Sequence, residues 1–222
     1  MNLDKYRNSE GKLWLNVASG NYFLDHFVHL DSNFLIGLSR IYPLIKTLLR
    51  PAGREWLRVY REGLAKGHRF IYANCSKPLK FPENSVDHIL ASHFLEHNYP
   101  DVLDGVLKGF FRALKPGGTL HIIVPDMEIR ARRYLEKCGT PEAVNEFVES
   151  LTFRYPKCPH WVIRWMQAIR LGQPEHCWMY DQYSMPALLR QHGFIIAAKN
   201  DSPSAQWRLT EWGQVNLLVR KP

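Results

Sequence analysis

The chain has 222 residues, of which 45% are hydrophobic and 13% aromatic, and it carries a formal net charge of +8. This length and composition are those of one globular domain with a sizeable core, and they exclude a disordered or low-complexity chain. The four cysteines are scattered without a C-x-x-C pair, which argues against a disulfide framework or a zinc finger and favours a reducing compartment. The N-terminal segment is polar and the most apolar window is too short to cross a bilayer. We therefore expect a cytoplasmic protein without a signal peptide or transmembrane segment.

The N-terminal stretch predicts a strand, a small-residue turn, a second strand and a carboxylate. A first apolar run ends at Ala18, Ser19 and Gly20, and a second begins at Phe27 and ends at Asp31. In an open α/β sheet, small residues let a ligand approach the backbone where the first strand ends. An acid after the next strand can accept hydrogen bonds from both ribose hydroxyls. The stretch therefore predicts a nucleotide site, and an ordinary tight turn is the alternative.

A basic region follows. Between residues 35 and 70 there are eight Lys or Arg against two acids, a local net charge of +6. Apolar stripes predict helices on both sides of a break at Pro51–Gly53, within an insertion of about 32–66. The basic stretch Arg50–Arg69 predicts an anionic partner, such as a phosphorylated acceptor, a lipid surface or nucleic acid. A solvated helix face and peripheral contact with a membrane surface are the alternatives.

The remaining elements alternate in the manner of a doubly wound sheet. We expect further strands over 68–73, 86–92, 119–124, 194–198 and 214–219. We expect helices over 100–114, 128–137, 141–153 and 184–191, and another beginning at residue 160. Residues 115–118 read as a turn of Pro and Gly. The fold class is thus α/β, with a Rossmann-like, seven-stranded, mostly parallel sheet and helices on both faces. One domain, 1–222, is expected, with helical insertions at about 32–66 and 127–175.

Four blocks carry a family resemblance. They are LNVASG at 15–20, LKFPENSVDHILASHFLEH at 79–97, ALKPGGTLHIIVPD at 113–126 and HCWMYD at 176–181. In this order and spacing they resemble the class I S-adenosylmethionine-dependent methyltransferases, most closely the small methyltransferase-domain proteins of the type 11-like group. The resemblance covers roughly residues 13–194. It implies S-adenosylmethionine as the cofactor.

The resemblance also implies a cofactor site. The methionine part of the cofactor would lie over the turn after the first strand, Asp31 would hold the ribose, and Asn74 and Cys75 would lie at the adenine. The implied cofactor-binding residues are Asn16, Ala18, Ser19, Gly20, Asp31, Asn74, Cys75 and Ser92. Ala18 stands where the family has glycine, and Asn74 stands where it often has an acid.

Methyl transfer from a sulfonium needs alignment of the nucleophile, and a general base when the acceptor is a hydroxyl or a protonated amine. We expect the catalytic residues to be His93, which follows the fourth strand, and His176 and Tyr180, in a segment that the resemblance places over the site. His93-x-x-Glu96-His97 also has a metal-ligand spacing. Because no remote carboxylate ligand is identifiable, we expect no metal and a local capping or pairing role for Glu96.

The sequence thus predicts an S-adenosylmethionine-dependent methyltransferase whose acceptor is a small molecule, a sugar or a lipid-linked glycan. Two alternatives stay open. One is a non-catalytic binding or partner module, which the residues at positions 18 and 74 motivate. The other is an RNA methyltransferase, although nucleic acid is the less favoured partner because no RNA-binding module is appended. A dinucleotide oxidoreductase is the least favoured function, since the turn VASGNY lacks GxGxxG.

Overall fold

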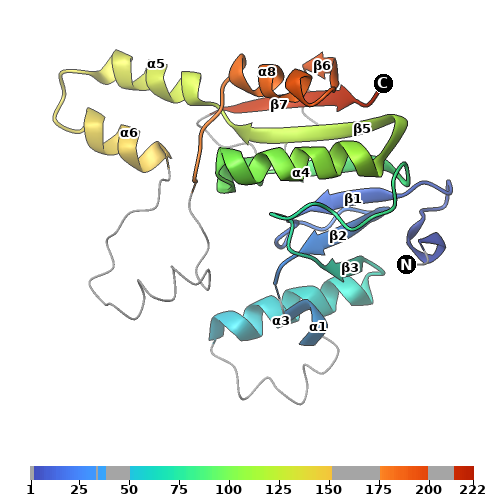
Figure 1. Ribbon diagram of the computed structural model, residues 1–222. Helices are drawn as coiled ribbons and strands as arrows, with labels where there is room; N and C mark the ends of the chain where they lie inside the picture. The colour runs from blue at the N-terminus through green and yellow to red at the C-terminus, as the bar shows by residue number, and fades with distance from the viewer. Residues whose placement is uncertain (1–2, 34, 39–50, 152–175, 200–212) are drawn as a thin grey trace.

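The structure is a computed structural model, and it describes residues 3–33, 35–38, 51–151, 176–199 and 213–222. Within these residues, seven strands form one sheet in the order β3-β2-β1-β4-β5-β7-β6 (Figure 1). The strands are β1 (Trp14–Val17), β2 (Phe27–Asp31), β3 (Arg69–Tyr72), β4 (Val86–Ser92), β5 (Leu114–Pro125), β6 (Ile195–Lys199) and β7 (Gln214–Arg220).

The sheet is mostly parallel. Strands β1 to β5 run in one direction, whereas β7 is antiparallel to both β5 and β6. The carboxyl ends of the five parallel strands therefore meet at one edge, which is where ligands bind in open α/β sheets. This arrangement confirms the predicted α/β, Rossmann-like, seven-stranded sheet.

Helices cover both faces of the sheet, as predicted (Figure 1). The described helices are α1 (Leu35–Leu38), α3 (Pro51–Ala65), α4 (Pro100–Ala113), α5 (Met127–Lys137), α6 (Ala143–Leu151) and α8 (Ser184–Gln191). Val106 and Phe110 of α4 join the main core with strand residues such as Ile89. On the opposite face, Tyr60 of α3 packs beside Phe70 of β3. None of the described helices is long and apolar enough to cross a membrane.

The connection from β1 to β2 is short. Two adjacent parallel strands normally need a crossover of a dozen or more residues, usually a helix. Here residues 18–26 make the crossover with turns alone. The side chain of Asn16 stabilises it, because its Nδ2 donates to the carbonyl oxygen of Tyr22 at 2.9 Å. Tyr22 in turn donates its N–H to the carbonyl oxygen of Ser19 at 2.9 Å.

Three sequence predictions need correction. Residues 51–53, which read as a break, lie in the first turn of α3, because the fixed φ of Pro51 suits that turn and its missing N–H is not needed there. Residues 115–118 lie inside β5, where the register against β4 shifts between Val86 and His88. This irregularity accommodates the Pro and Gly residues at 116–118, for which the sequence predicts a turn before the strand. Helix α6 begins at Ala143 instead of residue 141. The helix expected from residue 160 lies outside the described residues.

Candidate active site

The turn after β1 is tied to the end of β2. Gly20 donates its N–H to Asp31 Oδ2 at 2.8 Å, and Ser19 donates its N–H to the carbonyl oxygen of Leu30 at 3.1 Å. Asp31 Oδ1 accepts a further hydrogen bond from the N–H of Asn33 at 2.8 Å. A carboxylate oxygen can accept more than one hydrogen bond. Asp31 is half-buried, so its carboxylate can hold the turn and still accept a ribose hydroxyl.

The turn has the backbone shape of a glycine-rich turn although it holds only one glycine. Ala18 and Gly20 both adopt left-handed conformations, with φ of 51° and 55°. The methyl group of Ala18 packs against the main hydrophobic core. Ala18 therefore keeps the left-handed conformation that glycine usually supplies, and its methyl group has a place in the core. This backbone, with Asp31 beside it, fits the ribose and methionine parts of a nucleoside cofactor.

The loop after β3 brings the two predicted adenine residues to the same edge. Ala73 donates its N–H to the carbonyl oxygen of Asp31 at 2.9 Å, which places the loop beside the end of β2. Asn74 is exposed, and its Oδ1 accepts a hydrogen bond from the N–H of Ser76 at 3.1 Å. Cys75 is buried, and burial raises the pKa of its thiol to about 12, so the thiol stays neutral.

Asn16 has a different environment from the other predicted cofactor residues. It is buried within β1, and its amide nitrogen lies 3.3 Å from His29 Nδ1 as well as bonding to Tyr22. Its side chain therefore supports the turn that carries Ala18 to Gly20. Ser92, by contrast, lies at the carboxyl edge. Val17 and Ala91 are register partners in β1 and β4, so Ser92 and Ala18 follow at neighbouring strand ends.

The three predicted catalytic side chains surround a fourth residue, Glu96. Glu96 is fully buried in the short 3-10 helix η3 (Leu95–His97). His93 Nδ1 lies 3.2 Å from Glu96 Oε1, and His176 Nε2 lies 4.0 Å from the same oxygen. Burial and the nearby charge of Glu96 raise the pKa of Tyr180. We expected Glu96 to cap or pair locally: it makes no cap bond, but its carboxylate does pair locally with His93 and faces this cluster. The spacing His93-x-x-Glu96 was the sequence signal for it.

The backbone around this cluster is constrained. His93 has a φ of 50°, a strained value for a non-glycine residue, and such strain is often found at functional sites. Its Nε2 lies 3.0 Å from Gln214 Nε2 of β7, a neighbour that no sequence pattern identified. Burial lowers the pKa of His176, and its Nδ1 lies 2.8 Å from the carbonyl oxygen of Leu151. Because a carbonyl only accepts, Nδ1 carries the proton and Nε2 keeps its lone pair.

The segment 176–181 docks directly on this region. The N–H groups of Cys177 and Trp178 both donate to the carbonyl oxygen of Glu96, at 2.7 and 3.1 Å. Tyr180 accepts a hydrogen bond from the N–H of Met127 at 2.8 Å and forms a parallel bridge with Asp126. Backbone hydrogen bonds thus fix His176 and Tyr180 at the carboxyl ends of β4 and β5.

Two acids next to this region, Asp126 and Asp181, accept hydrogen bonds from backbone N–H groups. Asp126 is the N-cap of α5, where its Oδ1 accepts from the N–H of Glu128 at 2.9 Å. Asp181 Oδ1 accepts from the N–H groups of Tyr183 and Ser184, at 2.9 and 2.6 Å, beside the start of α8. These hydrogen bonds lower the pKa of Asp181. Both acids therefore have structural roles.

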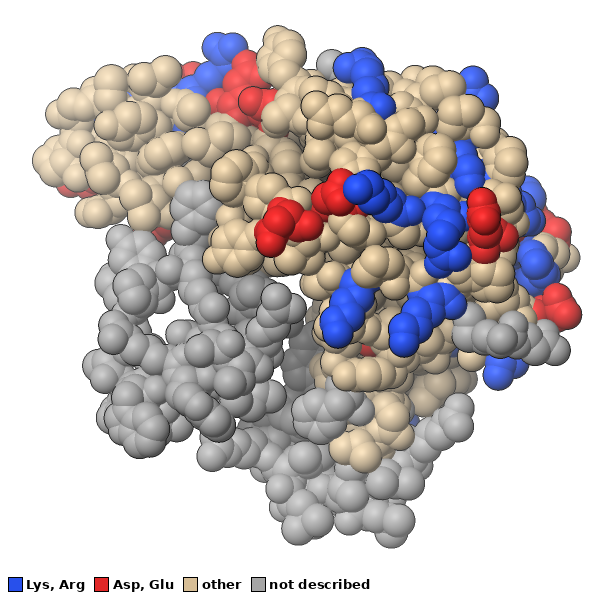
Figure 2. Space-filling model, in the orientation of Figure 1, with Lys and Arg blue, Asp and Glu red and all other residues tan. Residues whose placement is uncertain are grey.

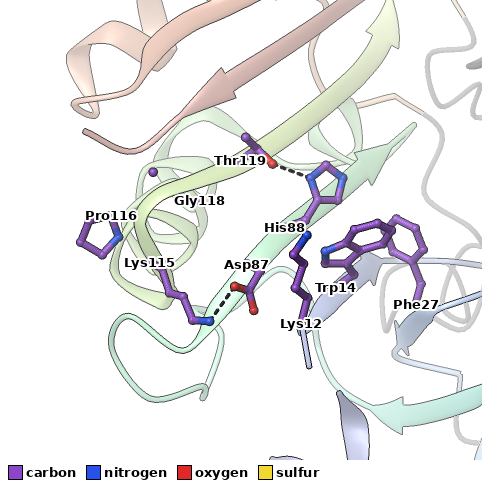
Figure 3. Close-up of a pocket in the computed structure, with 10 residues that line it drawn as sticks. Lys12, Trp14, Phe27, Asp87, His88, Lys115, Pro116, Gly118 and Thr119 are labelled. Carbon is purple, nitrogen blue, oxygen red and sulfur yellow. Dashed lines mark hydrogen bonds and ion pairs between the residues drawn. The ribbon is translucent and has the colours of Figure 1, made fainter. Parts of the chain in front are cut away.

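A pocket of about 420 Å³ lies at the opposite edge of the sheet (Figure 3). Trp14, Phe27 and His88, from the amino ends of β1, β2 and the first part of β4, line it, and the ion pair between Lys115 and Asp87 at 2.6 Å lies at its side. Because ligands of open α/β sheets bind at the carboxyl ends of the strands, we assign the candidate active site to the other edge.

Two arginines of the basic stretch Arg50–Arg69 already have partners in the structure. Arg58 forms ion pairs with Glu55 at 2.5 Å and Glu62 at 2.9 Å, and Arg69 donates to the carbonyl oxygens of residues 5 and 7. On the face drawn in Figure 2, lysine and arginine side chains have acidic side chains among them. Residues 40, 46 and 50 of the basic region, and the side chain of residue 54, lie outside what the structure describes.

Comparisons with known proteins agree with this geometry. Residues 45–122 match a family model described as a methyltransferase domain. No curated protein matches the sequence. Among solved structures, a SAM-dependent methyltransferase from Methanosarcina mazei is 15% identical, with a TM-score of 0.53, over 100% of this chain and 97% of that one. The PH0226 protein from Pyrococcus horikoshii is 14% identical, with a TM-score of 0.53, over 94% and 81%.

A further similar structure contains ligands. The 1,6-didemethyltoxoflavin-N1-methyltransferase from Burkholderia thailandensis, with bound 1,6-didemethyltoxoflavin and S-adenosylhomocysteine, is 17% identical. Its TM-score is 0.50, and the match covers 96% of this chain and 72% of that one. At these identities the likeness shows a common fold. The chain therefore has the fold of the class I S-adenosylmethionine-dependent methyltransferases, and residues 45–122 match the model of a methyltransferase domain.

Proposed function

We propose that this protein transfers the methyl group of S-adenosylmethionine to a small molecule, a sugar or a lipid-linked glycan. One observation carries the proposal: the left-handed turn at Ala18 and Gly20, tied to Asp31, lies at the same sheet edge as His93 and Glu96. The candidate cofactor site and the polar cluster around Glu96 are thus neighbours, in a chain that matches a methyltransferase domain. The matched domain and the ligand-bound structural neighbour support use of S-adenosylmethionine.

The cofactor would be held mainly by backbone groups and one carboxylate. Asp31 would accept hydrogen bonds from the ribose, the turn from Ala18 to Gly20 would face the methionine part, and Asn74 and Cys75 would lie at the adenine. S-adenosylmethionine supplies an activated methyl group. The protein then has to exclude water and to align the acceptor atom with the methyl carbon.

His176 is the best placed general base. Its Nδ1–H is held by the carbonyl oxygen of Leu151, so Nε2 is the atom that can take a proton from an acceptor hydroxyl or ammonium. Burial favours the neutral imidazole, which is the form that a base needs. His93 is the second candidate, and Tyr180, whose pKa is raised, would act as a hydrogen-bond donor that orients the acceptor.

Calorimetry with S-adenosylhomocysteine and S-adenosylmethionine tests the cofactor. We expect saturable binding with one site per chain. Transfer of a radiolabelled methyl group to fractionated small molecules, sugar nucleotides and lipid-linked glycans then identifies the acceptor class. Absence of binding at millimolar cofactor would refute the enzyme function and leave the non-catalytic module, which Asn74 favours because its side chain is engaged in a local turn.

The RNA alternative has a separate test. If the acceptor is RNA, positive charges must meet phosphates, and the affinity must fall steeply with salt. We expect weak binding of RNA with a shallow salt dependence, because Arg58 is already paired with Glu55 and Glu62. Tight binding that falls by orders of magnitude between low and moderate salt would favour RNA over the small-molecule acceptor.

A further inference from the structure

Glu96, His97 and His176 bring three metal-ligand types together inside the protein. One carboxylate oxygen and one imidazole nitrogen from each histidine all lie within 4.8 Å of one another. Glu96 and His97 come from η3, after β4, whereas His176 comes from the separate segment that docks on the Glu96 backbone. The ligand missing from the sequence motif is thus a remote histidine and not a carboxylate.

Three buried polar atoms of this cluster have no hydrogen-bond partner in the part of the chain that the structure describes. Among the described residues, both carboxylate oxygens of Glu96 and Nδ1 of His97 are inaccessible to solvent and make no hydrogen bond. Buried polar groups are nearly always hydrogen-bonded, and burying an unpaired carboxylate is costly. The 3.2 Å approach of His93 Nδ1 to Glu96 Oε1 lacks the angles of a hydrogen bond. A bound cation would satisfy these atoms together.

The surroundings of His176 prepare it as a ligand. Its Nδ1–H is directed to the carbonyl oxygen of Leu151 at 2.8 Å, and its Nε2 lone pair faces Glu96. A hydrogen bond from the second ring nitrogen to a carbonyl is the usual outer-shell support of a metal-bound histidine. Arg130, a buried cation close enough to feel the charge of Glu96, donates hydrogen bonds to the carbonyl oxygens of Ser150 and Asp126, at 3.0 and 2.8 Å.

We propose that Glu96, His97 and His176 form a binding site for a divalent transition metal ion, with Zn²⁺ as the best match. Two imidazoles and one carboxylate suit Zn²⁺, whereas Mg²⁺ prefers oxygen ligands. Ligands about 2.1 Å from Zn²⁺ in a tetrahedron lie roughly 3.4 Å apart, so small side-chain movements from the present spacing complete the set. Three protein ligands leave a fourth position open, as in catalytic zinc sites.

The site shares His176 with the proposed methyl transfer, so a bound metal would occupy the Nε2 lone pair assigned there to a general base. An acceptor hydroxyl or thiol bound at the open position would lose its proton more easily, because the metal lowers its pKa. The metal would then take part of the role assigned to a histidine base. Zinc binding and S-adenosylhomocysteine binding are measured separately, so failure of one leaves the other standing.

Metal titration of the purified full chain tests the proposal. After treatment with chelator, calorimetry with Zn²⁺ is expected to show one site per chain, and zinc is expected to raise the melting temperature. Glu96→Gln and His176→Gln are each expected to lower zinc affinity by at least about tenfold to a hundredfold. Mg²⁺ at the same concentration is expected to change neither signal.

Two matched controls exclude adventitious binding. His192→Gln removes a largely buried histidine, remote from the cluster, that lies 3.2 Å from Asp104, and Cys138→Ser removes an exposed thiol. Both variants are expected to bind zinc as the wild type does. The metal-free Glu96→Gln variant is expected to melt above the metal-free wild type, because it removes a buried charge without changing shape. No stoichiometric zinc in the wild type, or unchanged affinity in both ligand variants, would overturn the proposal.

Discussion

Gly20 donates its N–H to Asp31 Oδ2 at 2.8 Å, so the carboxylate after β2 holds the turn after β1. The other oxygen of Asp31 accepts from the N–H of Asn33 at 2.8 Å. The side chain that would hold the ribose therefore also shapes the turn that would face the methionine part. Cofactor affinity and local stability are coupled through this one carboxylate.

Asp31→Ala is expected to lower affinity for S-adenosylhomocysteine by about tenfold to a hundredfold, because one or two charge-assisted hydrogen bonds are lost. The melting temperature is also expected to fall, since Gly20 and Asn33 lose their acceptor. Calorimetry and thermal unfolding measure the two effects. Asp104→Ala, which removes an exposed carboxylate of α4, is the control and should leave affinity unchanged. Wild-type affinity in Asp31→Ala would place the ribose elsewhere.

Ala18→Gly is expected to keep or raise the stability, by up to about 1 kcal/mol. Ala18 has a φ of 51°, and a left-handed conformation costs a non-glycine residue about 1–2 kcal/mol, which the greater freedom of glycine in the unfolded chain partly offsets. Ala73→Gly is the control, because Ala73 has no such strain and should lose about 0.5–1 kcal/mol. Urea unfolding compares the two variants. Equal destabilisation of both would show that Ala18 is not strained.

The sheet was predictable because its signals are local. Each strand is a short apolar run bounded by turn residues, and the carboxyl ends of parallel strands must meet at one edge. That rule places the turn at Gly20 beside the acid at Asp31. In the structure a hydrogen bond joins these two residues. The cofactor edge therefore follows from strand order alone.

The cluster around Glu96 was only partly predictable. The spacing from His93 to Glu96 was visible, but the ligand from segment 176–181 depends on how that segment docks, through hydrogen bonds to the Glu96 carbonyl oxygen. Gln214 reaches His93 only because β7 pairs with β5, a long-range pairing that no local pattern encodes. The register shift that takes residues 115–118 into β5 is a tertiary effect of the same kind.

Two buried histidines are expected to make the fold sensitive to mild acid. Burial lowers the pKa of both His29 and His88 to about 4, from an ordinary 6.5. Between these values the unfolded chain binds a proton at each histidine and the folded chain does not. The contribution of the two neutral histidines to the free energy of unfolding is therefore complete above pH 6.5. It is lost as the pH falls, by up to about 1.4 kcal/mol per pH unit for each histidine.

His88→Asn tests this dependence. An asparagine amide can replace His88 Nδ1 as the partner of Thr119 Oγ1, now 2.7 Å away, but it does not titrate. Urea unfolding between pH 7.5 and pH 4.5 is expected to show a shallower loss of stability in the variant than in the wild type. The range ends above the pH at which most carboxylates protonate. Parallel curves for the two proteins would contradict the assignment to His88.

Helix α4 offers a matched pair of glycines for the last prediction. A Cβ at Gly109 would lie 2.9 Å from Pro78 Cα and 3.0 Å from the Leu79 nitrogen, whereas a Cβ at Gly105 would be 3.8 Å from Pro78 Cγ. Gly105→Ala is therefore expected to stabilise the protein by about 0.5–1 kcal/mol through helix propensity. Gly109→Ala is expected to cost about 1–3 kcal/mol, because backbone must move.

The same two glycine variants also test whether the loop after β3 helps to hold the cofactor. Pro78 and Leu79 lie in the loop that begins with Asn74 and Cys75, so pushing this loop away from α4 is expected to weaken S-adenosylhomocysteine binding in Gly109→Ala but not in Gly105→Ala. Urea unfolding gives the stability and calorimetry gives the affinity of both variants. If Gly109→Ala lost stability yet bound the cofactor as the wild type does, the loop after β3 would have no part in holding the adenine.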